Sequence, residues 1–348
     1  MLWGMAEPDE HWMRLALREA GRGVGRTSPN PAVGAVIVSA RGKMLARGWH
    51  RAVGGPHAEI EALGRLERPA SARGATLFVT LEPCSTHGRT PPCVEAIIGA
   101  GFARVVVGAI DPNPAHAGRG IDQLRAAGIE VIAGVLEAEA AEMNRAFNKW
   151  ITTGMPLVIA KCALSLDGRI TRLAGEGQWL TSEAARADAH RLRARVDAIV
   201  IGAGTLRADN PRLTARGGRG AMRQPWRVVL TRSGELPAGS HIFTDEHRDR
   251  TLVYRRRSLA SALRDLGARG VTSVLIEGGA EVLGEAFDKG LVDRAQFYVA
   301  PLLVGGPKVA IGGRGFSASD APRILNPKYR RIGNDLVMTG DVAKAKSD

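Results

Sequence analysis

Cysteine is scarce in this chain. Cys84, Cys93 and Cys162 are the only three in 348 residues. A small and odd number of thiols in so long a chain excludes a small scaffold held together by disulfides. We therefore expect a reducing compartment, the cytoplasm, where cysteines bind metals or take part in chemistry.

Long apolar runs are also missing. No segment approaches the ~20 consecutive apolar residues that a membrane-spanning helix needs. Glu7, Asp9 and Glu10 precede any apolar stretch, so we expect no secretory signal. The sequence predicts neither a membrane-spanning nor a secreted protein.

Aromatic residues make up 5% of the chain, too few to indicate a platform on which nucleic-acid bases stack. The net charge of +13 leaves two alternatives, a polynucleotide-binding protein or a basic enzyme with phosphorylated ligands. The excess is mostly dispersed arginine, and its densest short run is Arg255-Arg256-Arg257. This dispersion favours the enzyme, with no nucleic acid and no membrane as partner.

Apolar periodicity predicts two α/β domains, at 1–150 and 151–348. In the first we expect helices 9–20, 57–63, 92–100, 120–127 and 136–148, with strands 33–38, 44–49, 76–80, 104–109 and 129–133. A second series follows the Gly- and Pro-containing joint at 152–156. Its expected strands are 157–164, 198–202, 227–230, 273–276 and 295–301, with helices 182–194, 259–266 and 281–289. This alternation is typical of a largely parallel sheet.

The strongest chemical signal is His57-Ala58-Glu59, followed by Pro83-Cys84 and then Cys93. One imidazole and two thiolates suit zinc, and three protein ligands leave a position for the water of a catalytic site. Zinc lowers the pKa of such a water toward ~7. Glu59 can flank the metal and move a proton from the water to a leaving amine. The alternative is an ordinary surface histidine and two buried cysteines with no common role.

Eight residues separate Cys84 from Cys93, whereas tRNA and cytidine deaminases keep a shorter spacing. The segment 81–93, LEPCSTHGRTPPC, resembles the bifunctional riboflavin-biosynthesis deaminase/reductase family. The segments 30–35 and 111–114 are similar to it as well.

This resemblance implies a cytidine-deaminase-like three-layer domain at the N-terminus. It implies His57, Cys84 and Cys93 as zinc ligands and Glu59 as the proton shuttle. Family substrate contacts fall on Asn30, His50, Arg89, Asp111 and Asn113. Thr86 stands where the family usually has histidine. Arg89 could instead be an exposed loop arginine, and His50 a hydrogen-bonded histidine at a strand end.

In the second half, Ile276-Glu277-Gly278-Gly279 follows an apolar strand and opens a helix, and 202–205 gives a similar cue. Glycines at such turns admit a dinucleotide phosphate, although they also occur for backbone geometry alone. The segments 161–168, 178–181, 209–214 and 277–279 resemble the reductase domain of the same family, which is dihydrofolate-reductase-like.

The resemblance implies NADPH contacts at Ala163, Trp179, Thr205, Asp209 and Gly279. It implies substrate contacts at Gly177, Arg193, Leu213, Arg216 and Glu277. Gly177 stands where the family commonly has serine. Trp179 could instead be a buried core residue. No general acid is evident, so hydride transfer would depend mainly on positioning.

The resemblance therefore implies zinc-dependent deamination of 2,5-diamino-6-(5-phosphoribosylamino)pyrimidin-4(3H)-one, followed by NADPH-dependent reduction of the ribosyl group to ribityl. One alternative is a nucleoside or tRNA deaminase with an accessory domain. Another is an RNA-binding protein with a structural zinc. We also expect a homo-oligomer, a dimer or a tetramer.

Overall fold

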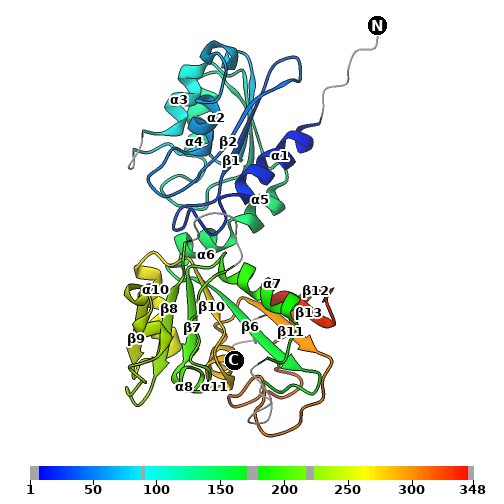
Figure 1. Ribbon diagram of the computed structural model, residues 1–348. Helices are drawn as coiled ribbons and strands as arrows, with labels where there is room; N and C mark the ends of the chain where they lie inside the picture. The colour runs from blue at the N-terminus through cyan, green and yellow to red at the C-terminus, as the bar shows by residue number, and fades with distance from the viewer. Residues whose placement is uncertain (1–7, 88–90, 171–178, 217–222, 344–348) are drawn as a thin grey trace. The chain divides into compact units, whose positions relative to one another are not determined.

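The chain folds into two compact units, Met1–Gly154 and Met155–Asp348. The computed structural model describes residues 8–87, 91–170, 179–216 and 223–343 (Figure 1). None of the helices in this described part is long and apolar enough to cross a membrane.

The first unit is built on a five-stranded sheet in the order β2-β1-β3-β4-β5. β1 runs antiparallel to β2 and β3, whereas β3, β4 and β5 are parallel. The strands are β1 (Gly34–Val38), β2 (Met44–Trp49), β3 (Thr76–Leu81), β4 (Arg104–Ala109) and β5 (Glu130–Ala133). The helices are α1 (Asp9–Gly21), α2 (Ala58–Leu63), η1 (Pro69–Ala72), α3 (Cys93–Ala100), α4 (Arg119–Ala126), α5 (Glu137–Met143) and α6 (Arg145–Thr153).

Helices cover both faces of this sheet. α1 and α5 pack on one face, and α2, α3 and α4 on the other (Figure 1). β1 is consequently buried along its whole length, which explains why its sequence is continuously small or apolar rather than alternating. The expected three-layer arrangement is confirmed.

The helix predicted at 136–148 is instead two helices, α5 and α6, which meet at Asn144. The buried Asn144 side chain accepts a hydrogen bond from the Ala32 N–H (2.8 Å) and donates one to the Ala32 carbonyl (3.0 Å). This contact spans more than a hundred residues, so local periodicity could not reveal the interruption.

The second unit contains an eight-stranded sheet in the order β12-β13-β11-β6-β10-β7-β8-β9. The six strands from β11 to β9 are parallel, and the β12–β13 hairpin extends the sheet in the antiparallel sense. The largely parallel sheet is thus confirmed. The strands are β6 (Leu157–Ser165), β7 (Ala198–Gly202), β8 (Trp226–Thr231), β9 (Thr251–Arg255), β10 (Ser273–Ile276), β11 (Arg294–Ala300), β12 (Ile324–Ile332) and β13 (Asp335–Val342).

The helices of this unit are α7 (Glu183–Arg193), α8 (Ala203–Asp209), α9 (His241–Thr244), η2 (Arg248–Arg250), α10 (Leu259–Ala268) and α11 (Ala280–Asp288). α10 and α11 enclose the larger apolar core on one face, and α7 packs on β11 and β13 on the other. The sequence analysis missed β9, β12, β13, α8 and α9. Most of β12 is exposed, so it lacks the apolar alternation that reveals a half-buried strand.

Candidate active sites

His57, Cys84 and Cys93 lie together in the first unit. The Nδ1 atom of His57 is 3.2 Å from Cys93 Sγ and 3.5 Å from Cys84 Sγ. All three ligand atoms lie within 4.8 Å of one another. One nitrogen and two sulfur donors in such an arrangement fit a zinc ion with one open coordination position. The described residues place three ligands here and no fourth, as a catalytic site requires.

Two helix starts and one strand end build this cluster. His57 immediately precedes α2, Cys93 is the first residue of α3, and Cys84 follows β3. The Cys93 N–H donates a hydrogen bond to Cys84 Sγ at 3.3 Å, a contact that favours the thiolate. The alternation of strands and helices thus brings the start of α2, the start of α3 and the segment after β3 to one site.

The ligands shift one another's pKa values. Hydrogen bonding from the Cys93 thiol, and then from His57, lowers the pKa of Cys84 to about 4. The hydrogen bond to Cys84, together with burial, raises the pKa of Cys93. The hydrogen bond with Cys84 raises the pKa of His57. Cys84 is thus the first thiol of the pair to ionise.

Glu59 lies in the first turn of α2 and is 3% exposed. Burial raises the pKa of its carboxyl group. A raised pKa makes a carboxylate a better proton acceptor. This property suits a proton shuttle beside the ligand cluster.

Asn30 and His50 lie beside the cluster. The His50 ring centroid is 5.3 Å from that of His57. His50 Nδ1 is 2.9 Å from the Pro56 carbonyl oxygen, to which it must donate, so its Nε2 accepts from Asn30 Nδ2 at 3.1 Å. Burial lowers the pKa of His50, in agreement with this neutral tautomer. Both ring nitrogens of His50 are therefore hydrogen-bonded, as the alternative interpretation required.

Asp111 and Asn113 follow the end of β4. Asp111 Oδ1 accepts from the Asn113 N–H at 2.9 Å, and Asn113 Oδ1 accepts from the Ala115 N–H at 3.1 Å. Burial raises the pKa of Asp111. These local turns arrange the two side chains on one short segment.

The sequence analysis missed Glu82, which is buried next to Pro83. Its carboxylate accepts from the N–H groups of Asp111 (3.2 Å), Gly118 (2.9 Å) and Gly120 (2.9 Å). A Cβ atom on Gly120 would lie only 2.2 Å from the Pro83 carbonyl oxygen, so glycine is required there. Glu82 thereby fixes the segment from Asp111 to the start of α4 against the strand end that carries Cys84. A charged residue directly after an apolar strand was the only signal.

In the second unit, the structure brings Thr205 and Gly279 together. Thr205 Oγ1 accepts a hydrogen bond from the Gly279 N–H at 2.9 Å. The turns before α8 and α11 approach each other closely. Glycine is required at position 278, because a Cβ atom there would lie 2.6 Å from Ile201 Cα. Both turns follow the carboxyl ends of neighbouring parallel strands, where such sheets bind ligands.

Arg193 and Glu277 form a bidentate ion pair, with distances of 2.6 Å and 2.7 Å. Lys161 Nζ lies 3.7 Å from Glu277 Oε2. Burial alone would raise the pKa of Glu277, but Arg193 and Lys161 lower it to about 2. The sequence analysis gave Lys161 no role, although a lysine inside an apolar strand was a signal.

Leu213 and Arg216 lie on the segment that precedes β8. Leu213 is 3% exposed and has a φ of 52°. The Arg216 side chain is exposed, and its Nε donates to Thr214 Oγ1 at 3.1 Å. Arg193 Nη1 donates to the Thr214 carbonyl oxygen at 3.3 Å, which links this segment to the ion pair.

The remaining candidates for cofactor binding, Ala163, Asp209 and Trp179, lie on three different segments of the second unit. Ala163 is half-buried in β6 and packs against the α7 side of the sheet. Asp209 ends α8, and burial raises the pKa of its carboxyl group. Trp179 is 56% exposed, with the Arg186 guanidinium 5.3 Å from its ring, so the alternative of a core tryptophan is wrong. Arg89 and Gly177 lie outside the described residues.

Comparison with known proteins assigns both units. Residues 6–109 match the model of the cytidine and deoxycytidylate deaminase zinc-binding region, and residues 156–338 match that of the RibD C-terminal domain. These matches confirm the cytidine-deaminase-like and dihydrofolate-reductase-like folds and argue against an unrelated accessory domain.

Similarity extends along almost the whole chain. The riboflavin biosynthesis protein RibD of Bacillus amyloliquefaciens is 40% identical over 358 residues, which cover 95% of either chain. The solved structure of Acinetobacter baumannii RibD, form 1, is 37% identical, with a TM-score of 0.88 over 96% of this chain and 99% of that one. A diaminohydroxyphosphoribosylaminopyrimidine deaminase/5-amino-6-(5-phosphoribosylamino)uracil reductase of Thermotoga maritima is 35% identical, with a TM-score of 0.86 over the same shares of the two chains.

Matches to both domain models in this order, with close similarity over almost the full length, show that the chain belongs to the RibD family of riboflavin-biosynthesis enzymes, which join a zinc-binding deaminase domain to a reductase domain.

Proposed function

We propose that the unit Met1–Gly154 deaminates 2,5-diamino-6-(5-phosphoribosylamino)pyrimidin-4(3H)-one and that Met155–Asp348 reduces the resulting 5-amino-6-(5-phosphoribosylamino)uracil with NADPH. This division is close to the domains proposed from sequence, 1–150 and 151–348. The full-length similarity to RibD proteins supports both activities.

In the deaminase unit, His57, Cys84 and Cys93 would hold zinc. The bound ion would polarise a water molecule and lower its pKa. Glu59 would take one proton from the water as its oxygen bonds to the ring carbon, and would deliver this proton to the adjacent ring nitrogen. It would then move the remaining hydroxyl proton to the 2-amino group, so that the carbon–nitrogen bond breaks, ammonia leaves and the water oxygen becomes the new ring carbonyl oxygen. Asn30, His50, Arg89, Asp111 and Asn113 orient the substrate. Glu59 is suited to this exchange because its buried carboxyl group lies in the first turn of α2, two residues beyond the ligand His57.

In the reductase unit, Ala163, Trp179, Thr205, Asp209 and Gly279 would contact NADPH. When bound, this cofactor supplies a hydride for the ribosyl carbon bonded to nitrogen, and solvent supplies the proton for the ring oxygen that is released. Gly177, Arg193, Leu213, Arg216 and Glu277 hold the phosphoribosyl group. Glu277 remains ionised because its pKa is about 2, which suits a hydrogen-bond acceptor for ribose hydroxyl groups.

The observation that carries this proposal is the presence, in one chain, of the zinc-ligand cluster with Glu59 and of the Arg193–Glu277 pair next to the 213–216 segment. The test measures ammonia release from the diaminopyrimidine and then NADPH oxidation in the same sample. We expect oxidation only after deamination. Ammonia release with no NADPH oxidation, even when the deaminated product is added directly, would show that the second unit is not this reductase.

We further propose that the protein is a cytoplasmic homo-oligomer, a dimer or a tetramer, with no nucleic-acid partner. The preference for NADPH over NADH is part of the same proposal. Light scattering at several protein concentrations measures the oligomeric state, and oxidation rates with each cofactor measure the preference.

A further inference from the structure

A buried arginine interrupts one strand of the reductase sheet. Arg227, in β8, is 1% exposed and is followed by the apolar residues Val228 and Val229. Its Nη1 forms an ion pair with Asp245 Oδ2 at 2.7 Å, and the Asp245 side chain is 6% exposed. Burying two charges is costly, and a pair of apolar residues at such positions is often equally or more stable. A contribution to stability therefore does not by itself explain why Arg227 and Asp245 occupy these buried positions.

The guanidinium of Arg227 makes three other contacts. Nη1 also donates to the Arg212 carbonyl oxygen at 3.2 Å, and Nη2 donates to the Ile242 carbonyl oxygen at 2.8 Å. Nε donates to Thr251 Oγ1 at 3.2 Å. Arg227 consequently ties the start of the 212–216 segment to the α9 region and to β9.

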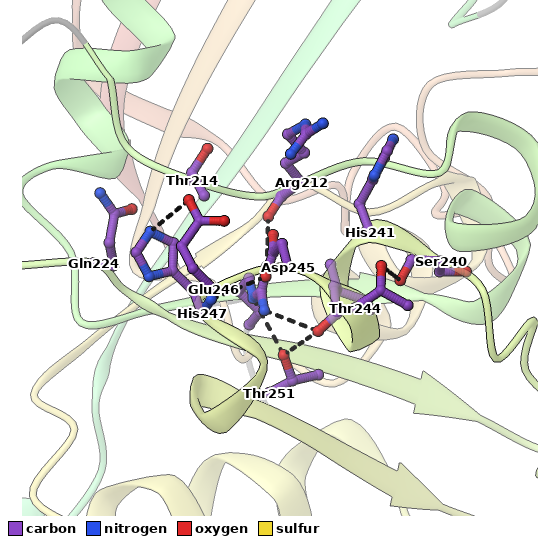
Figure 2. A network of polar contacts seen from close by, with 12 residues as sticks. Arg212, Thr214, Gln224, Ser240, His241, Thr244, Asp245, Glu246, His247 and Thr251 are labelled. Atoms are coloured by element: carbon purple, nitrogen blue, oxygen red, sulfur yellow. Dashed lines mark hydrogen bonds and ion pairs between the residues drawn. The ribbon is translucent and has the colours of Figure 1, made fainter.

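A second side chain holds the other end of this segment. Gln224 Oε1 accepts from the Ala215 N–H at 2.9 Å, and its Nε2 donates to the Ala215 carbonyl oxygen at 3.1 Å. Figure 2 shows Gln224, Arg212 and Thr214 near Asp245 and His247. The same residues line a pocket of about 390 Å³ that also includes Arg216. The segment thus has its main chain fixed at both ends beside an open pocket.

The backbone between these two attachments is strained. Leu213 has a φ of 52°, a left-handed conformation that costs a branched residue about 1–3 kcal/mol. Such a conformation persists only where the surroundings impose it. Arg227 and Gln224 supply this constraint on either side of Leu213.

We propose that Arg227 and Gln224 are positioning residues that hold the 212–216 segment in the conformation that presents Leu213 and Arg216 to the phosphoribosyl group. The proposal rests on the proposed function of the second unit. Neither residue needs to touch the substrate, because both act on the main chain of the segment.

The test compares the full-length variants Gln224→Ala, Arg227→Met and Arg227→Met/Asp245→Leu with the wild type. The double variant replaces the ion pair with apolar groups and therefore leaves no buried charge uncompensated. The measurements are kcat and KM for the deaminated pyrimidine, the Kd of NADPH, the deaminase rate, the Tm, and hydrogen exchange of the Ala215 amide. Arg269→Met is the matched control, because it removes an ion pair with Asp265 (2.7 Å) on α10.

We expect the double variant to recover the Tm of the wild type, while its KM for the pyrimidine rises about tenfold to a hundredfold. Gln224→Ala should raise KM about threefold to tenfold and speed exchange at Ala215. The Kd of NADPH, the deaminase rate and the kinetics of the Arg269→Met control should stay within about twofold of the wild-type values.

A double variant with both a recovered Tm and a wild-type KM would overturn the proposal, because the contacts of Arg227 would then be unnecessary for binding of the pyrimidine. If wild-type protein does not oxidise NADPH, the proposed reductase function has failed, and hydrogen exchange decides the positioning role separately. Unchanged Ala215 exchange in Gln224→Ala and in the double variant would then overturn it, and faster exchange in both would support it.

Discussion

The two units each contain an enclosed glutamate, and the pKa values of these two residues shift in opposite directions. Glu59 is 3% exposed, and burial raises the pKa of its carboxyl group. The Glu277 side chain is 6% exposed, yet its pKa falls to about 2 because Arg193 and Lys161 outweigh burial. The pKa of a buried carboxyl group therefore depends on the balance between burial, which prevails at Glu59, and charged neighbours, which prevail at Glu277.

This difference corresponds to two kinds of chemistry. A carboxyl group that must exchange protons benefits from a raised pKa, whereas one that serves as a fixed anion benefits from a lowered pKa. Zinc at the His57, Cys84 and Cys93 cluster would add positive charge beside Glu59 and lower its pKa again. The deaminase unit depends in this way on a bound ion, and the reductase unit supplies its cations from its own side chains.

Loss of the zinc ligands should produce the largest difference between the two units, because it should abolish one activity and leave the other unchanged. We expect Cys84→Ala/Cys93→Ala to lose zinc and to reduce deamination by at least about a thousandfold, because the pKa of the attacking water returns toward ~15.7. NADPH oxidation with added deaminated product should be unchanged. Metal analysis and the two rate assays measure this, with Cys162→Ala as a control that keeps zinc. Deamination at the normal rate without zinc would contradict the metal assignment.

Glu59→Gln tests the proton shuttle without removing a ligand. We expect zinc to be retained and kcat for deamination to fall about 10²- to 10⁴-fold, since proton transfer loses its carrier. Glu61→Gln is the matched control, because Glu61 forms a surface ion pair with Arg65 at 3.2 Å. A rate close to that of the wild type for Glu59→Gln would remove Glu59 from its proposed role.

Glu277→Gln tests the lowered pKa of Glu277, which is opposite to the shift at Glu59, through the stability of the second unit. The pKa of Glu277 is about 2 in the folded chain against an ordinary value of 4.5. Its charge therefore stabilises the fold by about 3 kcal/mol above pH 4.5. This contribution should disappear as the pH falls from 4.5 toward 2.

At pH 7 we expect the Tm of the second unit in Glu277→Gln to be about 6–12 °C below that of the wild type. This Tm difference between the variant and the wild type should decrease steadily as the solution is acidified below the ordinary glutamate pKa. Calorimetry at several pH values measures it. A gap that stays constant with pH would mean that the ionised carboxylate is not the stabilising form.

The smallest expected effect concerns the turn that carries Gly279. Thr205→Val removes the oxygen that accepts from the Gly279 N–H, and we expect the Kd of NADPH to rise about fivefold, the equivalent of ~1 kcal/mol. Thr205→Ser keeps the oxygen and should bind NADPH like the wild type. Titration calorimetry measures both, and equal weakening in the two variants would argue against this hydrogen bond.

The sequence alone indicated most of the fold and the zinc cluster. Apolar periodicity located β2, β4, β7 and β10 at their observed bounds, and it divided the chain into two α/β parts. The zinc ligands and Glu59 were recognisable from the residue types in His57-Ala58-Glu59, Pro83-Cys84 and Cys93, and from the resemblance of the segment 81–93 to a known family. Local sequence carries this information, because periodicity marks the regular elements and short motifs mark the metal-binding residue types.

The tertiary structure alone decided how the side chains pair. Arg193 and Glu277 are 84 positions apart, Glu82 accepts from N–H groups up to 38 positions away, and Asn144 holds Ala32 over 112. The Arg193–Glu277 contact reverses the effect of burial on a glutamate, so even the protonation state of that residue depended on the fold. Local periodicity reports which face of an element is apolar, but it contains no information on which distant polar group will satisfy a buried charge.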